Sequence, residues 1–181
     1  MSQAVADGTK VNNSVVRLVK DDVTDLEVNA FVYYAQHDLA LGSGFGTAIS
    51  IRGGPTVQKE LDELGPLSTG EVVVSGAGNM KVDYIIHAVG PRFQEEGIEA
   101  KLRTTMVNTL NAAEEKGIES VAFPAMGAGY YGVAADLSAR VMTEEIQKHL
   151  SGSTCIKDVV ICVFDSPQFN SFKGPVEALG K

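Results

Sequence analysis

Cysteine is scarce in this chain, and long apolar runs are missing from it. The two cysteines among the 181 residues, Cys155 and Cys162, suggest neither a disulfide framework nor a metal site. No apolar run approaches the length that a membrane-spanning helix needs, and the polar opening MSQAVADGTKVNNS lacks the layout of a secretory signal peptide. We therefore expect a cytoplasmic protein that holds no metal ion and no cofactor.

Clusters of basic residues are missing as well. The formal net charge is −8 at pH 7, and no group of Lys and Arg marks a nucleic-acid footprint. We therefore expect no membrane partner and no direct sequence-specific binding of nucleic acid. A small phosphate ligand is still compatible with this charge, because backbone amides can bind anions whatever the net charge of the protein.

The length suits one compact domain. A hydrophobic content of 44%, with seven Phe and five Tyr, is sufficient for one core, whereas two domains would each be short of apolar residues. Residues 1–13 are polar and are expected to form a flexible tail, because polar termini are commonly unpinned. A single domain is therefore expected over residues 14–181.

Apolar runs typical of buried strands alternate with longer segments of helical periodicity. The strand candidates are rich in Val, Ile, Phe and Tyr, and several are apolar on both faces. They cover Val15–Val19, Asn29–Tyr34, Glu71–Ser75, Asp83–Ala88, Glu119–Phe123 and Val159–Phe164. Apolar residues at helical spacing mark Thr47–Leu64, Glu96–Lys116 and Val133–Leu150. This order predicts a three-layer α/β/α sandwich, in which helices cover both faces of the sheet.

Two glycine-rich loops lie where a predicted strand gives way to a helix. Leu41–Thr47 precedes the first helix, and Gly127–Gly132 precedes the last. Ligands of open α/β sheets bind beyond the carboxyl ends of strands, and glycine lets backbone N–H groups approach an anion closely. Either loop alone is explained almost as well by a tight turn. Together, the two loops predict a site that grips a diphosphate from both sides.

The chain resembles the macro domain family in several segments that stand in the family's order. Lys20–Val32 is similar to the family's opening, which is usually Gly-Asp-Ile-Thr followed by a strand of the type Ala-Ile-Val. Further similar segments are Gly76–Asn79, Tyr84–Pro91 and Val121–Ala125, so that the resemblance covers roughly residues 15–165. It implies an α/β sandwich with a mixed, mostly parallel central sheet and a site for ADP-ribose, free or attached to a macromolecule.

The resemblance also implies roles for particular residues. Asp22 matches the residue that contacts adenine, although a carboxylate there is also suited to capping a helix. Tyr131 matches an aromatic against the distal ribose, and Phe164 is a candidate to stack on adenine, with plain core packing as the alternative. The ligand-binding residues expected from the family are Asp22, Val23, Tyr34, Gln36, Gly42, Ser43, Gly44, Phe45, Ala125, Gly127, Ala128, Gly129, Tyr130, Tyr131 and Phe164.

Two departures from the family pattern concern catalysis. Hydrolytic members typically carry Asn-Ala-Ala-Asn before the first loop, where this chain has Tyr33-Tyr34-Ala35-Gln36. They also tend to have an aspartate shortly after the loop glycines, where this chain has Gly46. The groups that orient the distal ribose and activate water are therefore replaced, which favours a protein that binds ADP-ribose without cleaving it.

An enzymatic alternative centres on His37. This residue and Asp38 directly follow the altered element, and a histidine that titrates near neutrality could act as a general base on ADP-ribose 1″-phosphate. A hydrolase for ADP-ribosylated substrates with a non-standard site belongs to the same alternative.

A second alternative comes from the glycine spacing. Gly127-x-Gly129-x-x-Gly132 is formally a dinucleotide fingerprint, and the next strand ends in Phe164-Asp165, where an acid could hold a ribose hydroxyl. An NAD-binding oxidoreductase of the Rossmann type would show this pattern. A structural module with degenerate loops is a third reading that the missing asparagines permit.

Overall fold

The fold is built around one mixed sheet. The structure, a computed structural model, describes residues 3–4, 8–42 and 44–180. Its sheet has eight strands in the order β1-β3-β8-β7-β4-β6-β5, with β2 also paired to β3. Strands β3, β8, β7, β4 and β6 are parallel, whereas β5 is antiparallel to β6, and β1 and β2 are antiparallel to β3. The expected mixed, mostly parallel sheet is therefore confirmed.

Each of the six predicted strands is present. The strands are β1 (Gln3–Ala4), β2 (Thr9–Val11), β3 (Ser14–Lys20), β4 (Ala30–Tyr34), β5 (Val72–Gly76), β6 (Tyr84–Ala88), β7 (Ser120–Phe123) and β8 (Asp158–Val163). Strand β4 is buried along its whole length, because helices cover both faces of the sheet at its centre. Successive β4 side chains alternate between the faces, so Tyr33 and Tyr34 point to opposite sides of the sheet.

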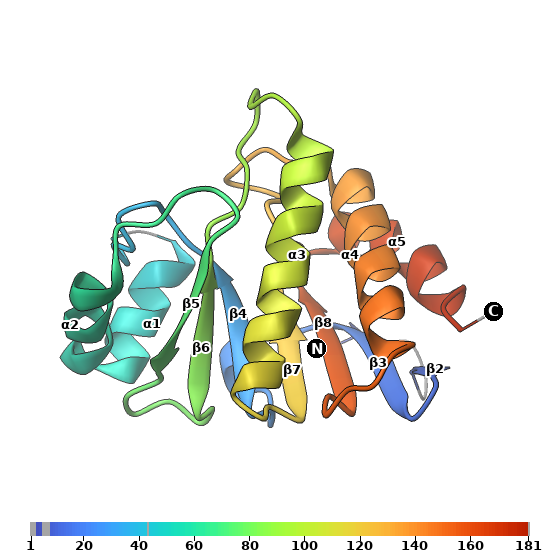
Figure 1. The fold of residues 1–181 in the computed structure, drawn as a ribbon, viewed down its shortest axis with the longest axis horizontal. Helices are drawn as coiled ribbons and strands as arrows, with labels where there is room; N and C mark the ends of the chain where they lie inside the picture. The colour runs from blue at the N-terminus through green and yellow to red at the C-terminus, as the bar shows by residue number, and fades with distance from the viewer. Residues whose placement is uncertain (1–2, 5–7, 43, 181) are drawn as a thin grey trace.

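Helices form the two outer layers of the sandwich (Figure 1). They are α1 (Phe45–Gly53), α2 (Pro55–Leu64), α3 (Ile98–Glu115), α4 (Ala135–Leu150) and α5 (Ser166–Glu177), with a short 3₁₀ helix η1 (Val23–Asp25) after β3. One core joins α3, α4 and α5 to the sheet face that carries Tyr34. The other joins α1 and α2 to the face that carries Tyr33.

The predicted helix Thr47–Leu64 is two helices. Gly54 lies between them with a φ of 85°, which is the left-handed region that glycine adopts without strain. Pro55 then opens α2, because proline at the first helical position has a suitable φ and needs no hydrogen-bond acceptor there. Periodicity alone misses this break, since apolar spacing continues across it.

The two ends of the chain differ from the expectation. A flexible tail was expected over residues 1–13, but Thr9–Val11 pairs antiparallel with β3, as does Gln3–Ala4. At the other end, α5 packs against β3 and α4. Helix α5 contains Pro167, Gly174 and Pro175, which are unfavourable in helices, so its sequence does not predict a helix.

Candidate functional site

A cleft of about 920 Å³ lies at the carboxyl ends of the parallel strands. Its walls come from the segments that follow β3, β4, β7 and β8, because parallel strands end at the same edge of the sheet. Most of the expected ligand-binding residues meet here. They are Asp22, Val23, Tyr34, Gln36, Gly44, Phe45, Ala125, Gly127, Ala128, Gly129, Tyr130, Tyr131 and Phe164.

Two of the expected residues are not in this lining. Gly42 and His37 lie outside it, and Ser43 falls outside the described residues. His37 is held elsewhere, since its Nδ1 lies 2.9 Å from the carbonyl oxygen of Leu67 and must donate to it. The Leu67 N–H in turn donates to the His37 carbonyl oxygen at 2.8 Å. The structure therefore does not bring His37 to the cleft.

The cleft also contains residues that the sequence analysis missed. They are Asp21, Val32, Tyr33, Ala48, Pro124, Cys162, Val163 and Gln168. Several of them stand at the ends of predicted strands, so the rule that ligands bind at carboxyl ends could have found them. Gln168 had no such signal, because it belongs to the unpredicted helix α5.

Glycines from both loops leave the cleft open. Gly44 caps the N-terminus of α1 with a φ of 58°, and a Cβ added to it would meet no heavy atom within 4 Å. Gly129 has a φ of 82°, and its nearest such neighbour would be the Nε2 of Gln168 at 3.9 Å. Among the described residues no side chain caps α1, and the Thr47 N–H donates to the Gly44 carbonyl oxygen at 3.1 Å, which leaves the N–H groups before Thr47 to bind an anion.

Tyr34 packs against the second glycine loop. Its side chain is 6% exposed, and its hydroxyl donates a hydrogen bond to the carbonyl oxygen of Pro91. Burial raises the pKa of Tyr34, so the hydroxyl remains a donor. A Cβ at Gly90 would overlap the Tyr34 hydroxyl, and one at Gly127 would lie 2.6 Å from the Val133 side chain and 3.0 Å from that hydroxyl oxygen. Glycine at these two positions therefore makes room for the tyrosine.

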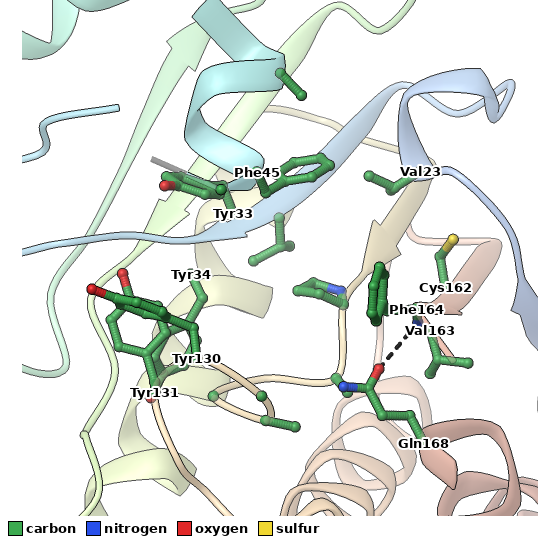
Figure 2. A pocket seen from close by; sticks show the side chains of 18 of the residues that line it. Val23, Tyr33, Tyr34, Phe45, Tyr130, Tyr131, Cys162, Val163, Phe164 and Gln168 are labelled. Atoms are coloured by element: carbon green, nitrogen blue, oxygen red, sulfur yellow. Dashed lines mark hydrogen bonds between the residues drawn. The ribbon is translucent and has the colours of Figure 1, made fainter. Parts of the chain in front are cut away.

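Tyrosines crowd one end of the cleft (Figure 2). The ring centroids of Tyr34 and Tyr131 are 4.9 Å apart, and those of Tyr130 and Tyr131 are 5.1 Å apart. The Arg92 guanidinium lies over the Tyr131 ring at 5.5 Å from its centroid. Burial also raises the pKa of Tyr131, so its hydroxyl stays protonated at neutral pH.

Asp22 caps the short helix η1 at the other end of the cleft. Its Oδ1 accepts hydrogen bonds from the N–H and hydroxyl of Thr24, at 2.9 Å and 2.6 Å, and so caps η1. These bonds hold the pKa of Asp22 below its usual value despite partial burial, and Arg52 contributes. Among the described residues, Oδ2 pairs with the Arg52 guanidinium at 3.5 Å, which leaves it able to accept a further hydrogen bond. The helix cap and a role in binding are therefore compatible.

Phe164 and Gln168 complete this end. The Phe164 side chain is 85% exposed, which rules out the alternative of core packing. Gln168 Oε1 accepts a hydrogen bond from the Phe164 N–H at 3.0 Å, which leaves the Gln168 amide group as a free donor (Figure 2). Cys162 lies beside them; burial raises the pKa of its thiol to about 12, so it is not a nucleophile at neutral pH.

The structure does not place Asp165 where the Rossmann alternative needs an acid. Asp165 Oδ1 accepts from the Gln168 N–H at 2.9 Å and caps α5, and Asp165 is not among the residues that line the cleft. Within the described residues there is no group of three His, Cys, Asp or Glu arranged to hold a metal ion. No described helix is long and apolar enough to cross a membrane.

Comparison with known proteins agrees with this geometry. The family model for the macro domain matches residues 28–142. A protein of Saccharolobus solfataricus is 37% identical over 162 residues, which are 87% of this chain and 90% of that protein. A macro domain-containing protein of Caldanaerobacter subterraneus subsp. tengcongensis is 33% identical over 172 residues, covering 92% of this chain and 98% of that protein.

Solved structures show the same fold. The Oceanobacillus iheyensis macrodomain with ADP superposes with a TM-score of 0.92 at 23% identity, covering 99% of this chain and 97% of that one. The Trypanosoma brucei macrodomain in complex with ADP-ribose gives a TM-score of 0.82 at 24% identity, covering 88% of this chain and 68% of that one. The chain belongs to the macro domain family.

Proposed function

We propose that this protein binds ADP-ribose, free or attached to a macromolecule, and does not cleave it. The observation that carries the proposal is the convergence of Gly44 and Gly129 on one cleft, each with open space where a side chain would project. Two loops in this arrangement can present backbone N–H groups to a diphosphate from opposite sides. The relatives solved with ADP and ADP-ribose support this ligand class.

The adenosine half fits the end formed by Asp22, Phe164 and Gln168. The Oδ2 of Asp22 can accept a hydrogen bond from the exocyclic amine of adenine, and the exposed ring of Phe164 can stack on the base. The Gln168 amide, directed by its bond to the Phe164 N–H, can donate to the sugar or phosphate. The diphosphate would then pass between the glycine loops, and the distal ribose would reach the tyrosines.

The groups at the distal end favour binding over hydrolysis. The positions where hydrolytic relatives carry Asn and Asp hold Tyr33, Gln36 and Gly46, none of which is a base at neutral pH. His37 is left out of the proposed site, because its ring is hydrogen-bonded to Leu67 outside the cleft. We therefore assign the protein a binding role.

Two substitutions at Asp22 separate its contact with the ligand from its role as the cap of η1. We expect Asp22→Ala to weaken ADP-ribose binding roughly 10–100-fold, since a hydrogen bond involving a charged group contributes ~1.5–3 kcal/mol. The same variant should also lose about 1 kcal/mol of stability with the η1 cap. Asp22→Asn keeps a capping oxygen, so its melting temperature should stay near that of the parent. Calorimetry and thermal melts measure both effects, and parental affinity in a folded Asp22→Ala would refute the adenine contact.

Removal of the Phe164 ring should affect binding alone. We expect Phe164→Ala to weaken ADP-ribose binding by about 1–3 kcal/mol, the range for stacking of a base on an aromatic side chain. Stability should not change, because the ring is 85% exposed. Ile51→Ala is the matched control, since it removes another exposed apolar side chain, on α1 outside the cleft lining. Equal affinities for the two variants would exclude stacking.

A further inference from the structure

Gly46 is a glycine for reasons of space. It lies in the first turn of α1, and its φ is not in the left-handed region that calls for glycine. A Cβ at this position would lie 2.7 Å from the hydroxyl oxygen of Tyr33 and 2.9 Å from the carbonyl carbon and oxygen of Leu41. Such contacts are too short for any side chain. Tyr33 and Gly46 are therefore one packing unit, in which the tyrosine hydroxyl takes the space of a residue 46 side chain.

The packing around Tyr33 fixes where its hydroxyl lies. The ring centroid is 5.9 Å from that of Phe45 and 5.9 Å from that of His87, and the side chain is 8% exposed. A ring held from two sides has little freedom to turn its hydroxyl away. Tyr33 nevertheless lines the cleft, and no hydrogen bond joins its hydroxyl to another residue that the structure describes.

The chemistry of this hydroxyl is that of a neutral hydrogen-bonding group. Burial, with a smaller contribution from Tyr131, raises the pKa of Tyr33 to about 12. The hydroxyl therefore stays protonated at neutral pH, so it can donate to a ligand oxygen or accept from a ligand hydroxyl. Because Tyr33 lines the open cleft, a sugar hydroxyl of a bound ligand can reach this group and pair with it.

We propose that the Tyr33 hydroxyl binds the distal ribose and sets the preference of this cleft for ADP-ribose over ADP. The inference rests on the proposed function, which places adenine against Phe164 and directs the distal ribose toward the tyrosines. Figure 2 shows Phe164 and Tyr33 on different sides of the pocket, with Tyr130 and Tyr131 at the tyrosine end. ADP lacks the second ribose, so it has no hydroxyl to offer there.

The test compares two ligands on two nearly isosteric variants. Calorimetric titrations with ADP-ribose and with ADP are made on the parent, Tyr33→Phe and Tyr84→Phe. We expect Tyr33→Phe to bind ADP-ribose about 5-fold more weakly, within the range for one neutral hydrogen bond, and to bind ADP as the parent does. Tyr84→Phe is the control, because this tyrosine lies at the start of β6, under Lys116 and away from the cleft.

Each other result overturns a specific statement. Parental affinity of Tyr33→Phe for ADP-ribose excludes the hydrogen bond while leaving the proposed function intact. An equal loss for ADP-ribose and ADP assigns Tyr33 to the packing of the phosphate loop and removes it as a source of preference. If the parent itself binds no ADP-ribose, the proposed function fails, and the inference fails with it.

Discussion

Gly129→Glu is expected to abolish the binding of ADP-ribose, with affinity lower by at least about 100-fold from exclusion and like-charge repulsion together. A side chain at this position projects into open space beside Gln168, which is the space that the diphosphate needs. The glutamate would fill that space and place a carboxylate against the phosphates. The left-handed φ of 82° adds strain of about 1–2 kcal/mol, which should lower the melting temperature without unfolding the protein. Calorimetry measures the affinity, and a thermal melt measures the strain.

Gly117→Glu is a close control for this variant. Gly117 has a φ of 67° and open space around its Cβ direction, but it follows α3 at the opposite end of the sheet. The control therefore carries the same charge change and a similar strain, and it should bind ADP-ribose as the parent does. If folded Gly129→Glu binds ADP-ribose as tightly as Gly117→Glu does, the proposal that two glycine loops bind the diphosphate is wrong.

The second large effect is a separation of binding from turnover. The protein is expected to bind ADP-ribose but to release almost none from a glutamate-ADP-ribosylated substrate. General-base catalysis alone contributes about 10²–10⁴-fold, and Tyr33, which is protonated at neutral pH, cannot act as the base that activates water. A time course of ADP-ribose release, compared with the substrate in buffer, measures the residual rate.

Two outcomes would change this assignment. Rapid release from the modified substrate would mean that an unconventional base operates in the cleft. Turnover of ADP-ribose 1″-phosphate that disappears in His37→Ala, with ADP-ribose affinity preserved, would make His37 a catalyst. That result would also require the His37 ring to leave its hydrogen bond with Leu67.

The strands of the fold could be predicted because burial on both faces produces runs of Val, Ile and Phe. Strand β8, Asp158–Val163, is buried at every position after the first, and its sequence is almost continuously apolar. The break between α1 and α2 at Gly54 and Pro55 was readable in principle, since proline favours a helix start. The pairing of Thr9–Val11 with β3 could not be predicted, because polar side chains on an edge strand resemble a loop.

The candidate site was predictable where glycine marks it. Gly44 and Gly129 stand in conspicuous loops, whereas Gln168 reaches the cleft from a helix whose proline-rich sequence hides it. The link between Tyr33 and Gly46 could not be predicted at all. The two residues belong to different elements of the fold. Only the packing of α1 onto the end of β4 shows that the Tyr33 hydroxyl fills the space of a residue 46 side chain.

The central claim is that the cleft binds ADP-ribose, and one calorimetric comparison tests it most directly. The unmodified protein is titrated with ADP-ribose, ADP and NAD under identical conditions. We predict saturable binding of ADP-ribose to a single site, with weaker binding of ADP and NAD. A preference for NAD, or no heat of binding with ADP-ribose, would contradict the assignment of this cleft.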